Sequence, residues 1–315
     1  MDSSSENIPV VHTEAGGNIP LMHYPRGFVD KFPWLGRYFA NIELEFVGET
    51  VTSWCRNNYW IAPAIVSVYL FLCYFCTKRM KTRSAFDLRR TLKLWNLLLA
   101  IFSIAGMIRV VPHLVYMLLT YGFEGTICLP ARMTYSDGPV GLWVFIYMVS
   151  KYFELIDTVF IVLRKRPLSF LHWYHHATVL WYTWDACCAE LPAGIYFVAM
   201  NYTVHAVMYF YYFLAAQMKR PLAWGIFVTI AQISQMFIGI GVTVVSMYYS
   251  SIYTHTEMEM THLFSPLAPL HSISRRNIYA AGLMYSTYLY LFAEYFVRRY
   301  IWKSRPDAFS KPKIV

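Results

Sequence analysis

The stretch LHWYHHATVL, residues 171–180, places three histidines inside a segment that is otherwise apolar enough to span a membrane. His172, His175 and His176 stand at positions i, i+3 and i+4, so a helix would carry all three on one face. Ionisable groups deep in a bilayer are costly and usually face a bundle interior or a water-filled cavity. The stretch therefore predicts a membrane helix with a functional face turned inward.

The rest of the chain has the composition of an integral membrane protein. Of its 315 residues, 57% are hydrophobic and only 14% are charged. A bilayer core of about 30 Å requires roughly 20 mostly apolar residues per helix. Such stretches predict an all-α protein with seven transmembrane helices, at 59–77, 93–119, 141–163, 170–188, 193–216, 223–250 and 278–301. The expected organisation is a polar lumenal segment (1–58), a transmembrane domain (59–301) and a cytosolic tail (302–315).

Basic residues alternate between the two sides of this predicted bundle. The connections after the first, third and fifth helices, together with the tail, hold 18 of the 27 Lys and Arg residues. Because these residues accumulate in cytosolic loops, we expect the N-terminus in the lumen and the C-terminus in the cytosol. The net charge of +9 then reflects orientation and gives no reason to expect nucleic acid as a partner. The same basic rim would attract anionic lipid or a phosphorylated substrate.

The chain ends with KPKIV, in which Lys311 and Lys313 are the fifth and third residues from the end. This pattern resembles the dilysine retrieval signal of endoplasmic reticulum membrane proteins, which is read in the cytosol. A multi-pass protein of the endoplasmic reticulum membrane is therefore expected.

Polar residues repeat at helical spacing in four consecutive predicted helices. At about 1.5 Å of rise per residue they lie within the cytosolic halves, whereas the other halves are apolar. The pattern predicts a polar chamber above an apolar pocket, which suits an amphipathic substrate with a reactive head. Lys151 and Glu154 also admit a simpler interpretation as a structural ion pair, and Arg109 and His113 are expected to serve packing or hydrogen bonding. The chamber set consists of Lys151, Glu154, Asp157, the three histidines, Asn201, His205, Gln232 and Gln235.

Two chemistries suit such a histidine cluster. Imidazoles on a helix can hold iron or zinc, and the membrane di-iron desaturases and hydroxylases use several clusters of this form, whereas this chain has one. Imidazole can also act as a nucleophile or general base, because it titrates near neutrality. Attack on an acyl thioester would give an acyl-imidazole, and His205 on the neighbouring helix could serve the next step. A receptor or transporter would explain seven helices but not three histidines on one face.

Four segments, in this order and spacing, resemble the sequence boxes of the ELO family, the elongases of very-long-chain fatty acids. They are KYFELIDT (151–158), LHWYHH (171–176), NYTVHAVMYFYY (201–212) and TIAQISQ (229–235). The resemblance implies a seven-helix bundle in which six helices enclose a narrow tunnel. It also implies a 3-ketoacyl-CoA synthase that condenses acyl-CoA and malonyl-CoA to 3-ketoacyl-CoA, CO2 and CoA. No cofactor beyond these substrates is implied.

The resemblance also assigns roles to residues. It implies that His175 accepts the acyl group in a ping-pong scheme and that His205 shares the reaction centre. His172 and His176 would orient His175 or polarise malonyl-CoA; no metal site is predicted, although a metal role for these two stays open. Donors such as Asn201, Gln232 and Lys151 would stabilise the enolate. The CoA phosphates are expected on a basic rim made of Arg164, Lys165, Arg166, Lys219 and Arg220.

Further implications concern substrate and partners. The HWYHH form of the box is most similar to family members that act on saturated and monounsaturated chains. The length of the tunnel is expected to be set near the lumenal end, on the fifth to seventh helices. Implied partners are membrane lipid and the ketoacyl reductase, dehydratase and enoyl reductase of the elongation cycle. A homo-oligomer is left open.

Overall fold

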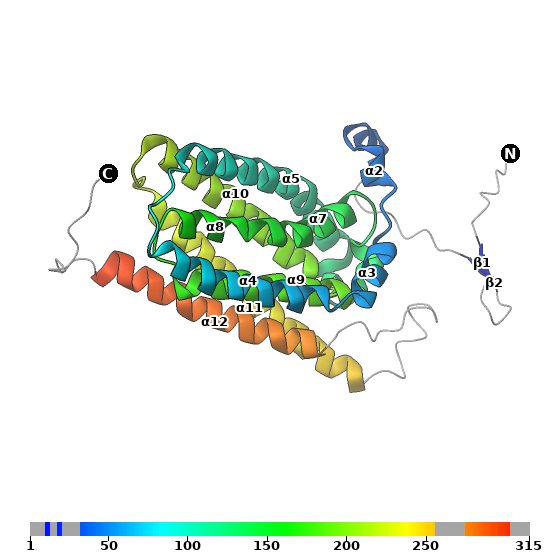
Figure 1. The fold of residues 1–315 in the computed structure, drawn as a ribbon. Coiled ribbons are helices and arrows are strands. Elements are labelled where there is room, and N and C mark those ends of the chain that lie inside the picture. Colours follow the sequence, from blue (N-terminus) through cyan, green and yellow to red (C-terminus); the bar gives the residue numbers. More distant parts are fainter. Residues whose placement is uncertain (1–9, 13–17, 21–31, 256–274, 303–315) are drawn as a thin grey trace.

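The computed structural model describes residues 10–12, 18–20, 32–255 and 275–302, and their regular secondary structure is helical apart from one short ribbon (Figure 1). In that ribbon β1 (Val10–His12) pairs antiparallel with β2 (Asn18–Pro20). The 3-10 helix η1 (Pro33–Tyr38), α2 (Asn41–Leu44) and α3 (Gly48–Asn57) precede the long helices. These are α4 (Ile61–Met80), α5 (Arg89–Cys128), the short α6 (Ala131–Thr134), α7 (Gly138–Glu154), α8 (Ile156–Leu163), α9 (Phe170–Cys188), α10 (Gly194–Met218), α11 (Gly225–His255) and α12 (Arg275–Phe296), which a π turn, η4 (Val297–Ile301), continues.

Six of the helical rods form a ring. In order around it, α5 packs on α7, α7 on α9, α9 on α12, α12 on α11, α11 on α10, and α10 returns to α5. Helix α4 lies outside this ring, against α8 and α9. We call the end of the bundle with the α4–α5 and α10–α11 connections and η4 the basic end, and the opposite end, with α3 and α6, the α3 end (Figure 1). The ring leaves room for side chains from six helices to meet in its interior.

The expected membrane character is confirmed. Within the described ranges, three helices are long and apolar enough to cross a membrane: Ile61–Met80, Arg89–Cys128 and Gly225–Ser251. Helices α9 and α10 carry histidines and many tyrosines, which lower their hydropathy although they pack inside the same bundle. The protein is therefore a membrane-embedded, all-helical bundle.

Element boundaries differ from the predicted spans in informative places. The predicted helix 141–163 is two helices, α7 and α8, which are separated by Leu155 between Glu154 and Ile156. After this break the N–H of Thr158 bonds to the carbonyl of Leu155, a tighter turn than an α-helix makes. The break lies within the KYFELIDT box and separates Glu154 on α7 from Asp157 on α8. The directions of these two side chains are therefore not fixed by the spacing of one continuous helix. Lys311, Lys313 and the rest of the predicted tail beyond Trp302 lie outside the described residues.

The segment before α4 packs on the bundle at the α3 end. Glu43 of α2 is buried, and it accepts hydrogen bonds from Arg109 Nε at 3.0 Å and Trp143 Nε1 at 2.7 Å. His113 Nε2 bonds to the carbonyl of Thr134 at 2.8 Å. Arg109 and His113 thus make the structural hydrogen bonds that the sequence predicted for them. Helix α3 packs against α7 and α9, so part of the predicted N-terminal segment belongs to the folded bundle.

Candidate active site

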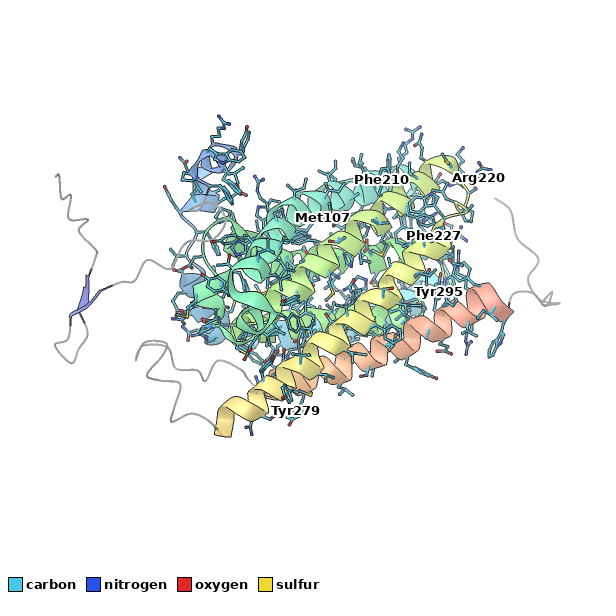
Figure 2. The ribbon with its side chains drawn as sticks, turned by 180° about the vertical axis from the view of Figure 1, so that it is seen from behind. Met107, Phe210, Arg220, Phe227, Tyr279 and Tyr295 are labelled. Carbon is cyan, nitrogen blue, oxygen red and sulfur yellow. The ribbon has the colours of Figure 1, made fainter. Side chains whose placement is uncertain are left out.

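A cavity of about 890 Å³ lies inside the ring toward the basic end. Its walls come from α5, from α7 to α11, which carry the four sequence boxes, and from α12 and η4. Figure 2 shows α10, α11 and α12 from outside, with Tyr295, one of the wall residues, on α12. Of the predicted chamber set, nine residues line this cavity: Glu154, Asp157, His172, His175, His176, Asn201, His205, Gln232 and Gln235. Lys151 is not among the wall residues.

The three box histidines share the inner face of α9. The ring centroids of His172 and His176 are 4.3 Å apart, and those of His175 and His176 are 5.5 Å apart. His172 Nε2 bonds to Thr158 Oγ1 at 2.9 Å, and Thr158 bonds in turn to Tyr69 OH of α4 at 2.9 Å. His176 Nδ1 is buried and has no hydrogen-bond partner within the described residues. The His172 ring is thus held by a hydrogen bond, and the His176 ring is enclosed by the protein.

His175 differs from its neighbours. Its ring packs against Tyr288, with centroids 4.8 Å apart, and meets Phe292 edge-on. Neither ring nitrogen has a hydrogen-bond partner among residues 32–255 and 275–302. Since His175 also lines the large cavity, a ring nitrogen is free to react there. It is the best-placed nucleophile among the box histidines.

Asp157 is held by donors from two other helices. Trp95 Nε1 of α5 donates to Oδ1 at 2.6 Å, and Tyr209 OH of α10 donates to Oδ2 at 2.9 Å. Both carboxylate oxygens are satisfied, which fixes the side chain in the cavity wall. Sequence reasoning missed Trp95 because it lies outside the four boxes, and it did not single out Tyr209, although that residue lies in one of them.

The polar cluster behind the cavity is centred on Lys151. Its ammonium donates to Glu154 Oε1 at 2.8 Å and to Asn201 Oδ1 at 2.9 Å. Asn201 Nδ2 lies 3.2 Å from His205 Nε2. The ion pair suggested by the sequence is therefore present, and Lys151 reaches the cavity only through its partners.

The basic residues that line the cavity are only partly those that the sequence predicted for the rim. Arg164 and Arg166 line the cavity, as do Arg298 and Arg299 of η4, which the sequence analysis did not single out. The dipeptide at 298–299, at the end of the last predicted helix, was the available signal. Lys165 instead donates to the backbone carbonyls of Lys81 and Arg83, and Lys219 and Arg220 are not wall residues. Figure 2 shows Arg220 on the turn between α10 and α11.

A second, smaller cavity of about 100 Å³ lies toward the α3 end. On three helices its wall begins about one turn beyond the polar residues, on the same face of the helix. Tyr147 is four residues from Lys151, Val179 is four from His175, and Phe197 is four from Asn201. Its side chains are mostly aromatic and aliphatic. The two cavities thus lie in succession along the bundle, with the histidines between them.

Residues before α4 form part of the wall of the smaller cavity, namely Phe46, Gly48, Val51 and Thr52. Gly48 N donates to Asp137 Oδ1 at 2.7 Å, and the carbonyl of Phe46 accepts from Gly138 N at 2.9 Å. A Cβ at Gly48 would lie 2.4 Å from the carbonyl oxygen of Ser136, so only glycine permits this approach. The segment is seated firmly against the start of α7.

Comparison with known proteins identifies the family. The chain matches the GNS1/SUR4 family, ELO, over residues 54–308. This protein belongs to the ELO family. Very long chain fatty acid elongase 6 of Drosophila melanogaster is 36% identical to it over 265 residues, which cover 84% of this chain and 79% of the relative. Very long chain fatty acid elongase 3 of Homo sapiens is 40% identical over 260 residues, covering 82% of this chain and 88% of the relative. The resemblance read from the four boxes is confirmed, and in this ELO protein residues of all four boxes contribute to the wall of the large cavity.

Proposed function

We infer that this ELO protein is a fatty acid elongase, a very-long-chain 3-oxoacyl-CoA synthase. It condenses a long-chain acyl-CoA with malonyl-CoA and releases 3-ketoacyl-CoA, CO2 and CoA. Membership of the ELO family and 36–40% identity to proteins named as very long chain fatty acid elongases support this function. The observation that carries it is the succession of a polar and an apolar cavity, with His175 between them, whose ring nitrogens have no hydrogen-bond partner in the part of the chain that the structure describes.

His175 accepts the acyl group in the proposed first step. Its free nitrogen attacks the thioester carbonyl, the C–S bond breaks, and CoA leaves as a thiolate that takes up a proton. In the second step malonyl-CoA loses CO2, and the resulting enolate carbon attacks the acyl-imidazole carbonyl. The C–N bond breaks, and the ring nitrogen takes up a proton from water, which restores His175. The reaction is redox-neutral and balances with the two CoA substrates and one proton, so we propose no further cofactor.

The cavities match the two ends of an acyl-CoA. The hydrocarbon chain would extend toward the smaller cavity, where burial of each methylene contributes about 0.8 kcal/mol. The phosphates of CoA would remain at the basic end, where Arg164, Arg166, Arg298 and Arg299 can give charge-assisted hydrogen bonds. His172 and His176 would orient His175 or polarise malonyl-CoA, while Asp157, Gln232 and Gln235 shape the polar wall.

The wider setting is part of the same proposal. The rods α4, α5, α7 with α8, α9, α10, α11 and α12 would be seven transmembrane helices, with the six-membered ring enclosing the substrate tunnel and α4 outside it. The basic end would face the cytosol and the α3 end the lumen of the endoplasmic reticulum. The 3-ketoacyl-CoA product must then be reduced, dehydrated and reduced again, which calls for a ketoacyl reductase, a dehydratase and an enoyl reductase as partners.

The test is a single-enzyme condensation assay. The purified protein in detergent is given an acyl-CoA and malonyl-CoA without reductant, and 3-ketoacyl-CoA is measured by mass spectrometry across saturated and monounsaturated chains of graded length. We expect product from the wild type. Absence of product from folded protein with every acyl-CoA supplied would contradict the proposed function.

A further inference from the structure

We propose that Lys151 and Asn201 are positioning residues that hold His205 in one tautomer, with its proton on Nδ1, so that His205 donates a hydrogen bond to the reacting substrate. This inference deepens the proposed function and rests on it. The two histidines that the family resemblance placed together at the reaction centre would then do different work. His175 would form the covalent bond, and His205 would stabilise negative charge on oxygen.

The cluster is buried, so its hydrogen bonds must be mutually consistent. Lys151 is 2% exposed, Glu154 3%, Asn201 7% and His205 9%. Buried polar groups in proteins are almost always paired donor to acceptor, because an unmatched pair loses hydration without compensation. One group in the cluster has a fixed hydrogen-bonding role, and it determines the arrangement of the others.

That group is the Lys151 ammonium, which can only donate. It lies 2.9 Å from Asn201 Oδ1 and 2.8 Å from Glu154 Oε1. Rotating the Asn201 amide by 180° would turn its NH2 group toward the ammonium, and two donors would then face each other. The ammonium therefore fixes which way the Asn201 amide points.

The orientation of Asn201 then determines the state of His205. With Oδ1 bonded to Lys151, the Asn201 NH2 group is the atom that lies 3.2 Å from His205 Nε2. An NH2 group can only donate, so Nε2 must carry a lone pair and the ring proton must be on Nδ1. The lone pair of Nε2 is already occupied, which leaves His205 poorly suited to attack a thioester.

The Nδ1 proton has a use in the cavity. Nδ1 lies 3.8 Å from Glu154 Oε1, too far for a good hydrogen bond. His205 and Glu154 both line the large cavity, so a substrate oxygen could take this donor. The thioester carbonyl and the enolate of decarboxylated malonyl-CoA both develop negative charge on oxygen. A preorganised donor at that position stabilises the charge as it forms.

The first test reads the tautomer directly. In protein labelled with 15N-histidine, long-range proton–nitrogen spectra distinguish Nδ1–H from Nε2–H rings, and the His205→Gln variant assigns the His205 signals. We expect the Nδ1–H pattern for wild-type His205. The Nε2–H pattern in the folded wild type would overturn the inference, whether or not any variant folds.

The second test separates the two half-reactions in Asn201→Asp. An aspartate of the same shape presents only acceptors, so His205 must move its proton to Nε2 and lose the donor toward the cavity. We expect the 15N pattern to switch and condensation to slow at least tenfold, while acyl loading on His175, measured by intact mass, persists. Unchanged condensation in the variant would contradict the inference. Thr203→Val, on the exposed side of the same helix, is the matched control and should alter neither measurement.

The two hypotheses fail in different ways. If wild-type protein makes no 3-ketoacyl-CoA, the proposed function is wrong, and the Nδ1–H pattern then has no catalytic meaning. If it makes product but His205 shows the Nε2–H pattern, only the division of work between the two histidines is wrong. Retained condensation in folded Asn201→Asp likewise overturns the positioning role alone.

Discussion

Two cavities inside the bundle share walls from α7, α9, α10 and α12 and have opposite characters. The larger, of about 890 Å³, is lined by histidines, carboxylates, amides and arginines. The smaller, of about 100 Å³, is lined mainly by aromatic and aliphatic side chains. On α7, α9 and α10 the change takes roughly one helical turn. The contrast shows how a few helices can hold a polar reaction centre and an apolar chain-binding region without a separate domain for either.

The cavities also differ in what bounds them. Arginines of the α8–α9 connection and of η4 line the larger one at the basic end, whereas residues from the segment 46–52, which precedes α4, form part of the wall of the smaller one. The family match begins at residue 54. The boundary of the smaller cavity is therefore supplied partly by a segment outside the matched region.

The largest effect is expected at the junction of the two cavities. His175→Ala removes the free imidazole and should lower condensation roughly 10³-fold or more, as loss of a covalent nucleophile does. The rate of 3-ketoacyl-CoA formation measures this, and thermal unfolding checks that the variant is folded. The control is Phe237→Ala, because Phe237 is 61% exposed and lies on the outer face of α11. Residual activity near the wild-type rate would show that His175 is not the acyl acceptor.

The next largest effect is expected at the arginines that line the large cavity at the basic end. Neutralising either Arg298 or Arg299 to Gln should raise the KM for acyl-CoA by about 10- to 100-fold, because each lost charge-assisted hydrogen bond is worth roughly 1.5–3 kcal/mol. The kcat should change far less. The matched pair Lys219→Gln and Arg220→Gln, which are not wall residues, should leave KM unchanged. If the Lys219 and Arg220 variants raised the KM and the Arg298 and Arg299 variants did not, the CoA-binding residues predicted from the sequence would be the correct ones.

The apolar side is tested through product length. Phe46→Ala enlarges the smaller cavity and should favour the next longer acyl-CoA by about tenfold in relative kcat/KM, the effect of one or two methylenes in an apolar pocket. Val51→Phe should favour the shorter one. Val47→Ala, at a 54% exposed position, is the control. Active variants with the wild-type length profile would mean that this segment does not limit the chain.

The smallest effect concerns stability at the α3 end. Glu190 accepts hydrogen bonds from Arg132 Nε at 2.7 Å and Thr52 Oγ1 at 3.0 Å, which join α3 and α6 to the α9–α10 connection. Burial alone would raise the pKa of the Glu190 carboxyl, but the bonds from Arg132 and Thr52 outweigh it and hold the pKa below its ordinary value of 4.5. Folding thus favours the ionised carboxylate.

A lowered folded-state pKa gives a stability contribution that is complete above pH 4.5 and is lost as the pH falls through the folded value. We expect Glu190→Gln to lower the Tm by about 2–4 °C at neutral pH. The difference from wild type should shrink as the pH drops below 4.5. A difference that stayed constant down to that range would assign the loss to packing rather than to charge.

The histidine face was predictable because helical spacing alone fixes which residues share a face. The residues of the basic rim were harder to predict. Arg164, Lys165 and Arg166 are adjacent in sequence, yet only the two arginines line the cavity. A charge run near a helix end does not reveal the direction of each side chain. The contacts of Thr158 with Tyr69 and of Asp157 with Trp95 join residues far apart in the chain, so no local pattern signals them.

The most direct test of covalent catalysis by His175 is the intact mass of purified protein after incubation with a long-chain acyl-CoA in the absence of malonyl-CoA. We predict a gain equal to one acyl group, which disappears in His175→Ala and is discharged when malonyl-CoA is added. Wild-type protein that shows no adduct, yet condenses the same acyl-CoA once malonyl-CoA is present, would contradict covalent catalysis by His175.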